Sequence, residues 1–219
     1  MVSVFSFAML AFFKLFPILN PPAMAPVFQE ITSGARERQR NILAVRVSIY
    51  TFYLLASLLL VGGWLLRILG VSIDMIGIAG GMLLFHTAWR MLNRDEHLTR
   101  SEQEEIKGMS DKVFFPLTMP MTAGPGAIAV TLSMVPTGSF FAVETMLNIL
   151  GLCTGIAMAA ITVWIFYRFS GAFLSRIGKT AKATIGQISA FILMAIGVQL
   201  IWTSLSNLIR AYVNSLSIQ

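Results

Sequence analysis

The sequence has few charged residues, two histidines and a single cysteine. Only 12% of its 219 residues are charged, whereas 56% are hydrophobic; a soluble domain carries about 25% charged residues. A chain this poor in charge cannot cover a water-exposed surface, so its composition indicates a membrane protein and excludes an ordinary soluble domain. The single cysteine, Cys153, lies in an apolar segment. Because a disulfide needs two cysteines, none can form within the monomer.

The sequence also lacks the motifs of the common enzyme classes. It contains no Gly-x-Ser-x-Gly elbow, no His-Glu-x-x-His pair and no phosphate-binding loop of the Walker type. These short patterns mark serine hydrolases, zinc proteases and nucleotide hydrolases. No pair of carboxylates occurs deep in an apolar segment either. We therefore expect no enzymatic activity, no bound metal and no cofactor.

Six segments are apolar enough, alone or with their flanks, to cross a membrane. A helix needs about 20 residues to cross a bilayer core of about 30 Å. The first segment contains one charge, Lys14, and the third is short and needs its flanks. The sequence therefore predicts an all-α membrane protein with six transmembrane helices. The predicted spans lie in segments 1–29, 47–66, 75–89, 113–143, 145–167 and 183–209.

The basic residues are distributed unevenly between the loops. Thirteen of the sixteen lysines and arginines follow the first, third and fifth predicted spans, and only Arg67 and Arg210 follow an even-numbered span. Because cytoplasmic loops are enriched in basic residues, we expect the loops after odd-numbered spans to be cytoplasmic and both termini to lie outside. This distribution explains the net charge of +6 without a nucleic-acid partner.

The two halves of the chain are weakly similar to each other. Setting Pro21 on Pro125 also sets Ala23 on Ala127. Each half has three predicted spans, an odd number, so the second half must enter the membrane in the opposite sense and the repeat is an inverted 3+3 repeat. The predicted organisation is a single transmembrane domain, 1–219, made of repeat one (1–93), a cytoplasmic linker (94–112) and repeat two (113–219).

Both halves contain an interruption centred on proline within their first span. The interruptions are Asn20-Pro21-Pro22-Ala23 and Gly124-Pro125-Gly126-Ala127. In lipid a helix is broken only where the freed backbone groups find partners or line a polar cavity. Spans 1 and 4 are therefore predicted to be discontinuous, with breaks that meet near the middle of the membrane.

The chemistry of the two breaks indicates a site for a small zwitterion. Asn20 is expected to be the N-cap of a half-helix that begins at Pro21, while prolines at 21 and 22 leave carbonyl groups of the preceding turn without donors. A carboxylate could bind the half-helix N-termini and an ammonium group the freed carbonyls. The alternative is that the breaks only permit tight helix packing. The predicted site residues are Asn20, Pro21, Pro22, Ala23, Thr122, Gly124, Pro125, Gly126 and Ala127.

Three stretches resemble the MarC family of bacterial and archaeal inner-membrane proteins: residues 16–28 (FPILNPPAMAPVF), 79–85 (AGGMLLF) and 116–128 (PLTMPMTAGPGAI). The resemblance covers nearly the whole chain. It implies six spans with two broken helices in an inverted repeat, in a bacterial inner membrane, and some family members transport glycine, alanine and other neutral amino acids. In such a membrane the distribution of basic residues places both termini on the periplasmic side. A glycine is usual in the family where Ala23 stands, and Pro22 adds a second proline, so we expect a narrower first half-site.

Together these observations predict a secondary transporter that moves small neutral amino acids by alternating access. The expected partners are the amino acid, the surrounding membrane lipids and a coupling ion, either a proton or sodium. Two alternatives stay open. One is an exporter of drugs or other small metabolites, which would need a larger apolar cavity, and the other is a membrane interaction protein that transports nothing.

Overall fold

The computed structural model describes residues 4–32, 34–93, 113–136, 142–172 and 178–216. Within these ranges every regular element is helical and none is a strand. The predicted linker, 94–112, lies outside the described residues. In chain order the elements are α1 (Val4–Leu19), α2 (Pro21–Ile31), α3 (Glu37–Leu69), α4 (Ile73–Asn93), η1 (Val113–Thr122), α6 (Pro125–Ser133), α7 (Val143–Arg168) and α9 (Lys179–Leu216).

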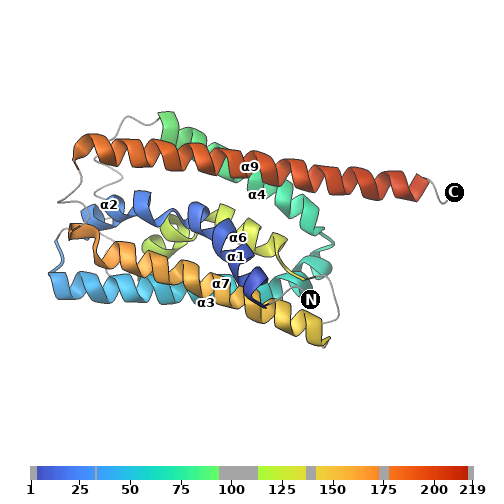
Figure 1. The fold of residues 1–219 in the computed structure, drawn as a ribbon, viewed down its shortest axis with the longest axis horizontal. Helices are drawn as coiled ribbons and strands as arrows, with labels where there is room; N and C mark the ends of the chain where they lie inside the picture. The colour runs from blue at the N-terminus through green and yellow to red at the C-terminus, as the bar shows by residue number, and fades with distance from the viewer. Residues whose placement is uncertain (1–3, 33, 94–112, 137–141, 173–177, 217–219) are drawn as a thin grey trace.

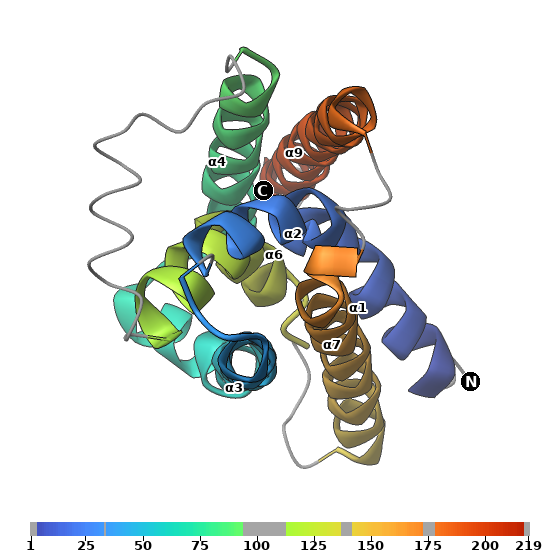
Figure 2. The same ribbon diagram turned by 90° about the vertical axis from the view of Figure 1, so that its left-hand side faces the viewer.

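The helices form a bundle in which the short elements lie between the long ones. In Figure 1, α4 and α9 pack side by side along the top, and α3 and α7 lie along the bottom. Figure 2 shows α2 and α6 between these two pairs. The main packing partners are α4 with α9 and α6, and α7 with α1 and α3. The short helices that follow the breaks therefore occupy the middle of the bundle.

Four single helices are long and apolar enough to cross a membrane among the described residues: α3, α4, α7 and Ala183–Asn214 of α9. Two further pairs meet the same test only together. The α1–α2 pair is bent by 45° and the η1–α6 pair by 67°. The count is thus four spans, or up to six if each bent pair is one span. The prediction of an all-helical membrane protein is confirmed.

Large apolar side chains cover much of the outer surface. Trp64 on α3 and Trp202 on α9 are each 66% exposed, and Phe13 on α1 is 67% exposed. Exposed residues of this kind are costly in water but meet acyl chains of similar polarity in a bilayer. The bundle interior is equally apolar, with Leu15, Leu55 and Ile156 fully buried. Apolar residues on both sides of each helix are the expected pattern for a membrane bundle.

Small residues let α4 approach its neighbours closely. A Cβ added to Gly80 would overlap the side chain of Ala129 on α6, and one added to Gly81 would lie 2.6 Å from the carbonyl oxygen of Gly197 on α9. Helix association in lipid depends on such close packing because apolar burial gives little driving force there. These contacts fix α4 against both α6 and α9.

Candidate functional site

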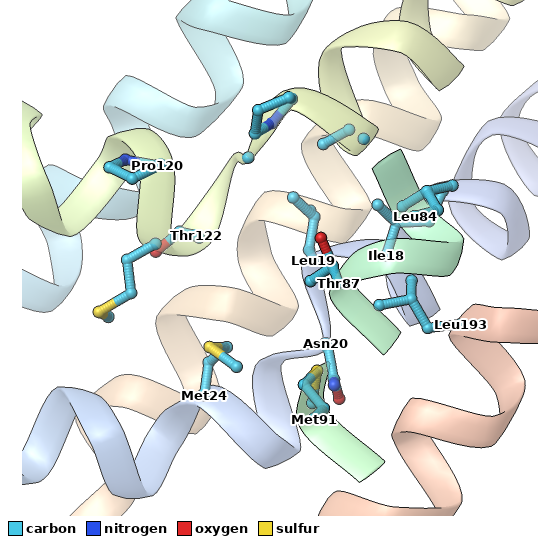
Figure 3. A pocket seen from close by; sticks show the side chains of 15 residues that line it. Ile18, Leu19, Asn20, Met24, Leu84, Thr87, Met91, Pro120, Thr122 and Leu193 are labelled. Carbon is cyan, nitrogen blue, oxygen red and sulfur yellow. The ribbon is translucent and has the colours of Figure 1, made fainter. Parts of the chain in front are cut away.

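The two helix breaks meet at a cavity of about 230 Å³. Figure 3 shows this cavity, which lies between the end of α1, the start of α2, the start of α6 and the inner faces of α4 and α9. Its lining residues are Ile18, Leu19, Asn20, Met24, Leu84, Thr87, Met91, Pro120, Met121, Thr122, Gly124, Pro125, Gly126, Ala127 and Leu193.

Most of the predicted site residues line this cavity, although the first break contributes less than expected. From the second break the lining includes Thr122 and all of Gly124-Pro125-Gly126-Ala127, but from the first it includes only Asn20. Pro21, Pro22 and Ala23 are not among the lining residues. The first residue of α2 that lines the cavity is Met24.

The chain changes direction at Asn20, which adopts a left-handed backbone conformation with φ 47° and ψ 52°. Its N–H donates to the carbonyl of Phe16 at 3.0 Å and its carbonyl accepts from the N–H of Met24 at 3.0 Å. Asparagine enters this region more readily than most residues. The break therefore rests on one residue, with α1 ending at Leu19 directly before it and α2 beginning directly after it.

The Asn20 side chain does not cap α2, which corrects the expectation that it would act as an N-cap. It occupies the N-cap position but makes no side-chain cap hydrogen bond. The residue is only 5% exposed, and its Nδ2 is buried with no hydrogen-bond partner among the described residues. Buried polar groups almost always have partners in native structures. Asn20 lines the cavity, but its Nδ2 has almost no accessible surface, so a ligand would reach this donor only after the side chain rotates.

The second break ends at the start of α6. Gly124 is extended, with φ −75° and ψ 177°, and Pro125 is the first helical residue. The carbonyl of Gly124 accepts from the N–H groups of Ala127 at 3.0 Å and Ile128 at 3.2 Å. Because Gly124, Pro125 and Gly126 line the cavity, the N-terminal end of α6 and the positive end of its dipole lie at the cavity.

Thr122 lines the cavity, but its hydroxyl is already bonded on the protein side. Its Oγ1 donates to the carbonyl of Leu117 at 2.7 Å and lies 2.9 Å from the hydroxyl of Tyr167. A threonine hydroxyl has only one proton to donate. Thr122 therefore offers the cavity no free proton, in contrast to Asn20.

One wall of the cavity comes from helices that the sequence reasoning did not include. Leu84, Thr87 and Met91 lie on one face of α4, and Leu193 of α9 lies beside them in Figure 3. The spacing of three and four residues on α4 marks a common face. That spacing could have identified the face, but nothing in the sequence says whether it meets the breaks or the lipid.

The cavity lining carries no charged side chain. Its polar side chains are Asn20, Thr87 and Thr122, and the remaining lining is aliphatic, prolyl, glycyl or methionyl. Among the described residues, no three of the His, Cys, Asp and Glu side chains are grouped so that they could hold a metal ion. A ligand with a net charge would remain unneutralised here, so the lining favours a neutral molecule or a zwitterion.

Comparisons with known proteins agree with the resemblance seen in the sequence. The model of the family described as "MarC family integral membrane protein" matches residues 5–209. The UPF0056 membrane protein YvbG of Bacillus subtilis is 29% identical over 209 residues, which cover 94% of this chain and 97% of that protein. The UPF0056 inner membrane protein MarC of Escherichia coli K12 is 28% identical over 222 residues, covering 97% and 100%. No solved structure matches the chain.

Proposed function

Because the chain belongs to the MarC family of integral membrane proteins, we propose that it is a secondary transporter for small neutral amino acids. Substrates of the glycine and alanine class would cross the inner membrane by alternating access. The relatives named above are called only membrane or inner membrane proteins, so their names indicate no substrate. The proposed substrate class is inferred from the cavity at the two helix breaks.

The order of the helices supports an inverted repeat with two broken spans. If each bent pair is one span, the first half is a broken span followed by α3 and α4, and the second half is a broken span followed by α7 and α9. Each half then has the same order of elements and an odd number of spans, which reverses the orientation of the second half. The breaks would lie at equivalent positions on either side of a pseudo-two-fold axis.

The ends of the broken helices suit a ligand that carries both signs of charge. The carboxylate of an amino acid would lie at the start of α6, where the helix dipole favours an anion. The ammonium group would lie near the end of α1, where the carbonyl of Ile18 loses its usual donor because position 22 is a proline. Ile18 and the first residues of α6 both line the cavity.

The size of the cavity favours a small solute over a drug. Pockets for drug-sized ligands measure about 300–1,000 Å³, whereas this cavity is about 230 Å³. A compact amino acid with a short side chain fits a space below that range. The three methionines in the lining, Met24, Met91 and Met121, are flexible and adapt to small differences in ligand shape.

The observation that carries the proposal is that the end of α1, Asn20 and the start of α6 line one cavity whose lining has no charged side chain. Rotation of the Asn20 side chain would turn its unpartnered Nδ2 toward the substrate carboxylate. Its test is uptake of labelled alanine into proteoliposomes containing the unsubstituted chain or Asn20→Gly. Glycine accepts a positive φ, so this change removes the amide and keeps the backbone conformation. A hydrogen bond to a charged group contributes about 1.5–3 kcal/mol, so we expect the KM for alanine to rise by about 10- to 150-fold.

Asn93→Gly is the matched control because it makes the same chemical change at an exposed asparagine at the end of α4. Its KM should equal that of the unsubstituted chain. Absence of alanine flux in the unsubstituted chain would refute the proposal. Inhibition by hydrophobic cations but not by glycine would favour a drug exporter, and no flux of any solute would favour a membrane interaction protein.

A further inference from the structure

Tyr167 is the largest of the fully buried side chains in the described part of the chain. It lies one residue before the end of α7 and does not line the cavity. Its hydroxyl lies 2.9 Å from Oγ1 of Thr122, which does line the cavity. Burying an unpaired hydroxyl costs free energy. The bond to Thr122 avoids that cost and connects α7 to η1.

The direction of this bond follows from counting protons. Oγ1 of Thr122 donates its only proton to the carbonyl of Leu117, which cannot itself donate. In the bond between the two hydroxyls Tyr167 is therefore the donor and Thr122 the acceptor. Both hydroxyls are then satisfied in one continuous chain that runs from Tyr167 through Thr122 to Leu117. Removing the tyrosine hydroxyl leaves the bond from Thr122 to Leu117 in place.

The ring of Tyr167 contacts the other broken segment. It stacks on Phe28 of α2, with ring centroids 4.3 Å apart and planes inclined by 14°. Phe28 is fully buried, and it lies one helical turn after Met24, which lines the cavity. One tyrosine thus contacts α2 through its ring and η1 through its hydroxyl.

These two contacts join the parts of the chain on either side of the cavity. Helix α2 begins at the first break, and Thr122 is the last residue of η1 before the second break. Helix α7, which carries Tyr167, is continuous from Val143 to Arg168. A side chain on an unbroken helix therefore contacts both broken segments, although it does not itself line the cavity.

We propose that Tyr167 is a positioning residue that sets the distance between the two helix breaks. Its hydroxyl holds Thr122, its ring holds Phe28, and the cavity keeps a binding-competent width while both contacts persist. The role in binding rests on the transport function proposed above. When the broken segments move apart during a transport cycle, the Tyr167–Thr122 bond is the contact that breaks.

The test measures how readily a thiol inside the cavity reacts, and it needs no substrate. Cys153 is the only cysteine, so Cys153→Ser with Leu193→Cys gives a protein with one thiol, at a lining position that is 3% exposed. The rate of its reaction with a maleimide is compared in this background and after adding Tyr167→Phe. The phenylalanine keeps the ring stack on Phe28 and removes only the hydroxyl. Elution as a single peak and an unchanged melting profile check folding.

We expect Tyr167→Phe to raise the reaction rate by about two- to tenfold, the range that corresponds to one hydrogen bond of ordinary net strength. Tyr53→Phe, at a tyrosine that is 65% exposed on α3, makes the same chemical change and should leave the rate unaltered. In a Thr122→Val background, where the acceptor is already absent, Tyr167→Phe should not raise the rate further. An equal rate with and without the Tyr167 hydroxyl, or a full effect in the Thr122→Val background, would overturn the proposal.

Alanine uptake separates this inference from the function on which it rests. If the unsubstituted chain carries alanine, Tyr167→Phe should raise KM more than it changes the maximal rate, because fewer molecules are competent to bind. If the chain carries no alanine but the thiol rates follow the expected pattern, only the proposed function fails. If alanine is carried and the thiol rates do not change, only the positioning role fails.

Discussion

Gly126 and Leu84 are in contact so closely that no side chain fits between them. A Cβ added to Gly126 would lie 2.8 Å from Cγ of Leu84 and would overlap its Cδ2. Both residues line the cavity. The Leu84 atoms that the Cβ would meet belong to the end of a flexible side chain, so Leu84 can change its rotamer, and because Leu84 lines the cavity such a change alters the space there. The contact therefore links helix packing to cavity size.

The first prediction concerns this contact. Gly126→Ala should reduce the space for a ligand by displacing Leu84, and it should impair alanine uptake more than glycine uptake because alanine is larger by one methyl group. Overpacking of this kind costs about 1–3 kcal/mol of stability. The measurement is the ratio of the two KM values in proteoliposomes, and an unchanged ratio would contradict the prediction. In the double variant Gly126→Ala with Leu84→Ala, the ratio should return toward its original value.

The second prediction separates the backbone role of Asn20 from its side-chain role. Asn20→Ala should lower stability by about 1–2 kcal/mol because alanine is strained at a positive φ, whereas Asn20→Gly should not. Thermal unfolding of the purified protein measures the difference. Both variants lack the amide, so both should bind alanine weakly. If the alanine and glycine variants unfolded at the same temperature, residue 20 would not adopt a left-handed backbone conformation in the folded protein.

The third prediction concerns the end of α2. Oε1 of Gln29 accepts from Nη1 of Arg40 at 2.9 Å and from Oγ of Ser170 at 2.8 Å. Gln29→Leu would leave both donors without this acceptor and should cost about 1–3 kcal/mol. Gln29→Glu keeps an acceptor oxygen and should be close to the unsubstituted chain in a thermal unfolding assay. If the leucine and glutamate variants melt at the same temperature, this oxygen contributes nothing to stability.

The fourth prediction compares two glycines in similar helical settings. An added Cβ at Gly81 meets the backbone of Gly197, which cannot move aside, whereas one at Gly186 meets nothing within 4 Å. Gly81→Ala should therefore lower the melting temperature by separating α4 from α9. Gly186→Ala should raise stability by about 0.5–1 kcal/mol through its higher helix propensity. If both substitutions raised the melting temperature, or both lowered it, the packing described for α4 and α9 would be contradicted.

The positions of the helix breaks could be predicted because proline chemistry is local. A proline cannot donate a backbone hydrogen bond, so Asn20-Pro21-Pro22-Ala23 and Gly124-Pro125-Gly126-Ala127 could be located without coordinates. The ends of the spans have no comparable local signal. The charge-free segment 113–143 was predicted to hold the whole fourth span, but its helical pair ends at Ser133. A charge-free segment therefore gives the maximum extent of a span but not the residues at which its helices end.

Other features depend on contacts between distant parts of the chain. The sequence suggested that Asn20 would cap α2, but its side chain makes no cap bond, because local preference does not determine where a side chain points in the folded bundle. The α4 wall at Thr87 and the contact between Tyr167 and Thr122 join residues far apart in sequence. Neither has a local signal, and each follows only from the way the helices pack.

Helix α9 is longer than the membrane requires. Its 38 residues correspond to about 57 Å at 1.5 Å per residue, and Figure 1 shows its C-terminal end extending beyond the other helices. The uncharged segment 183–209 within it alone measures about 40 Å, against a hydrocarbon core of about 30 Å. The apolar ends of an upright α9 would extend beyond the hydrocarbon core, and tilting, kinking or local thickening of the bilayer would accommodate them. The length of the lipid acyl chains therefore influences the tilt of α9. Because α9 contributes Leu193 to the cavity, the shape of the cavity depends on the composition of the bilayer.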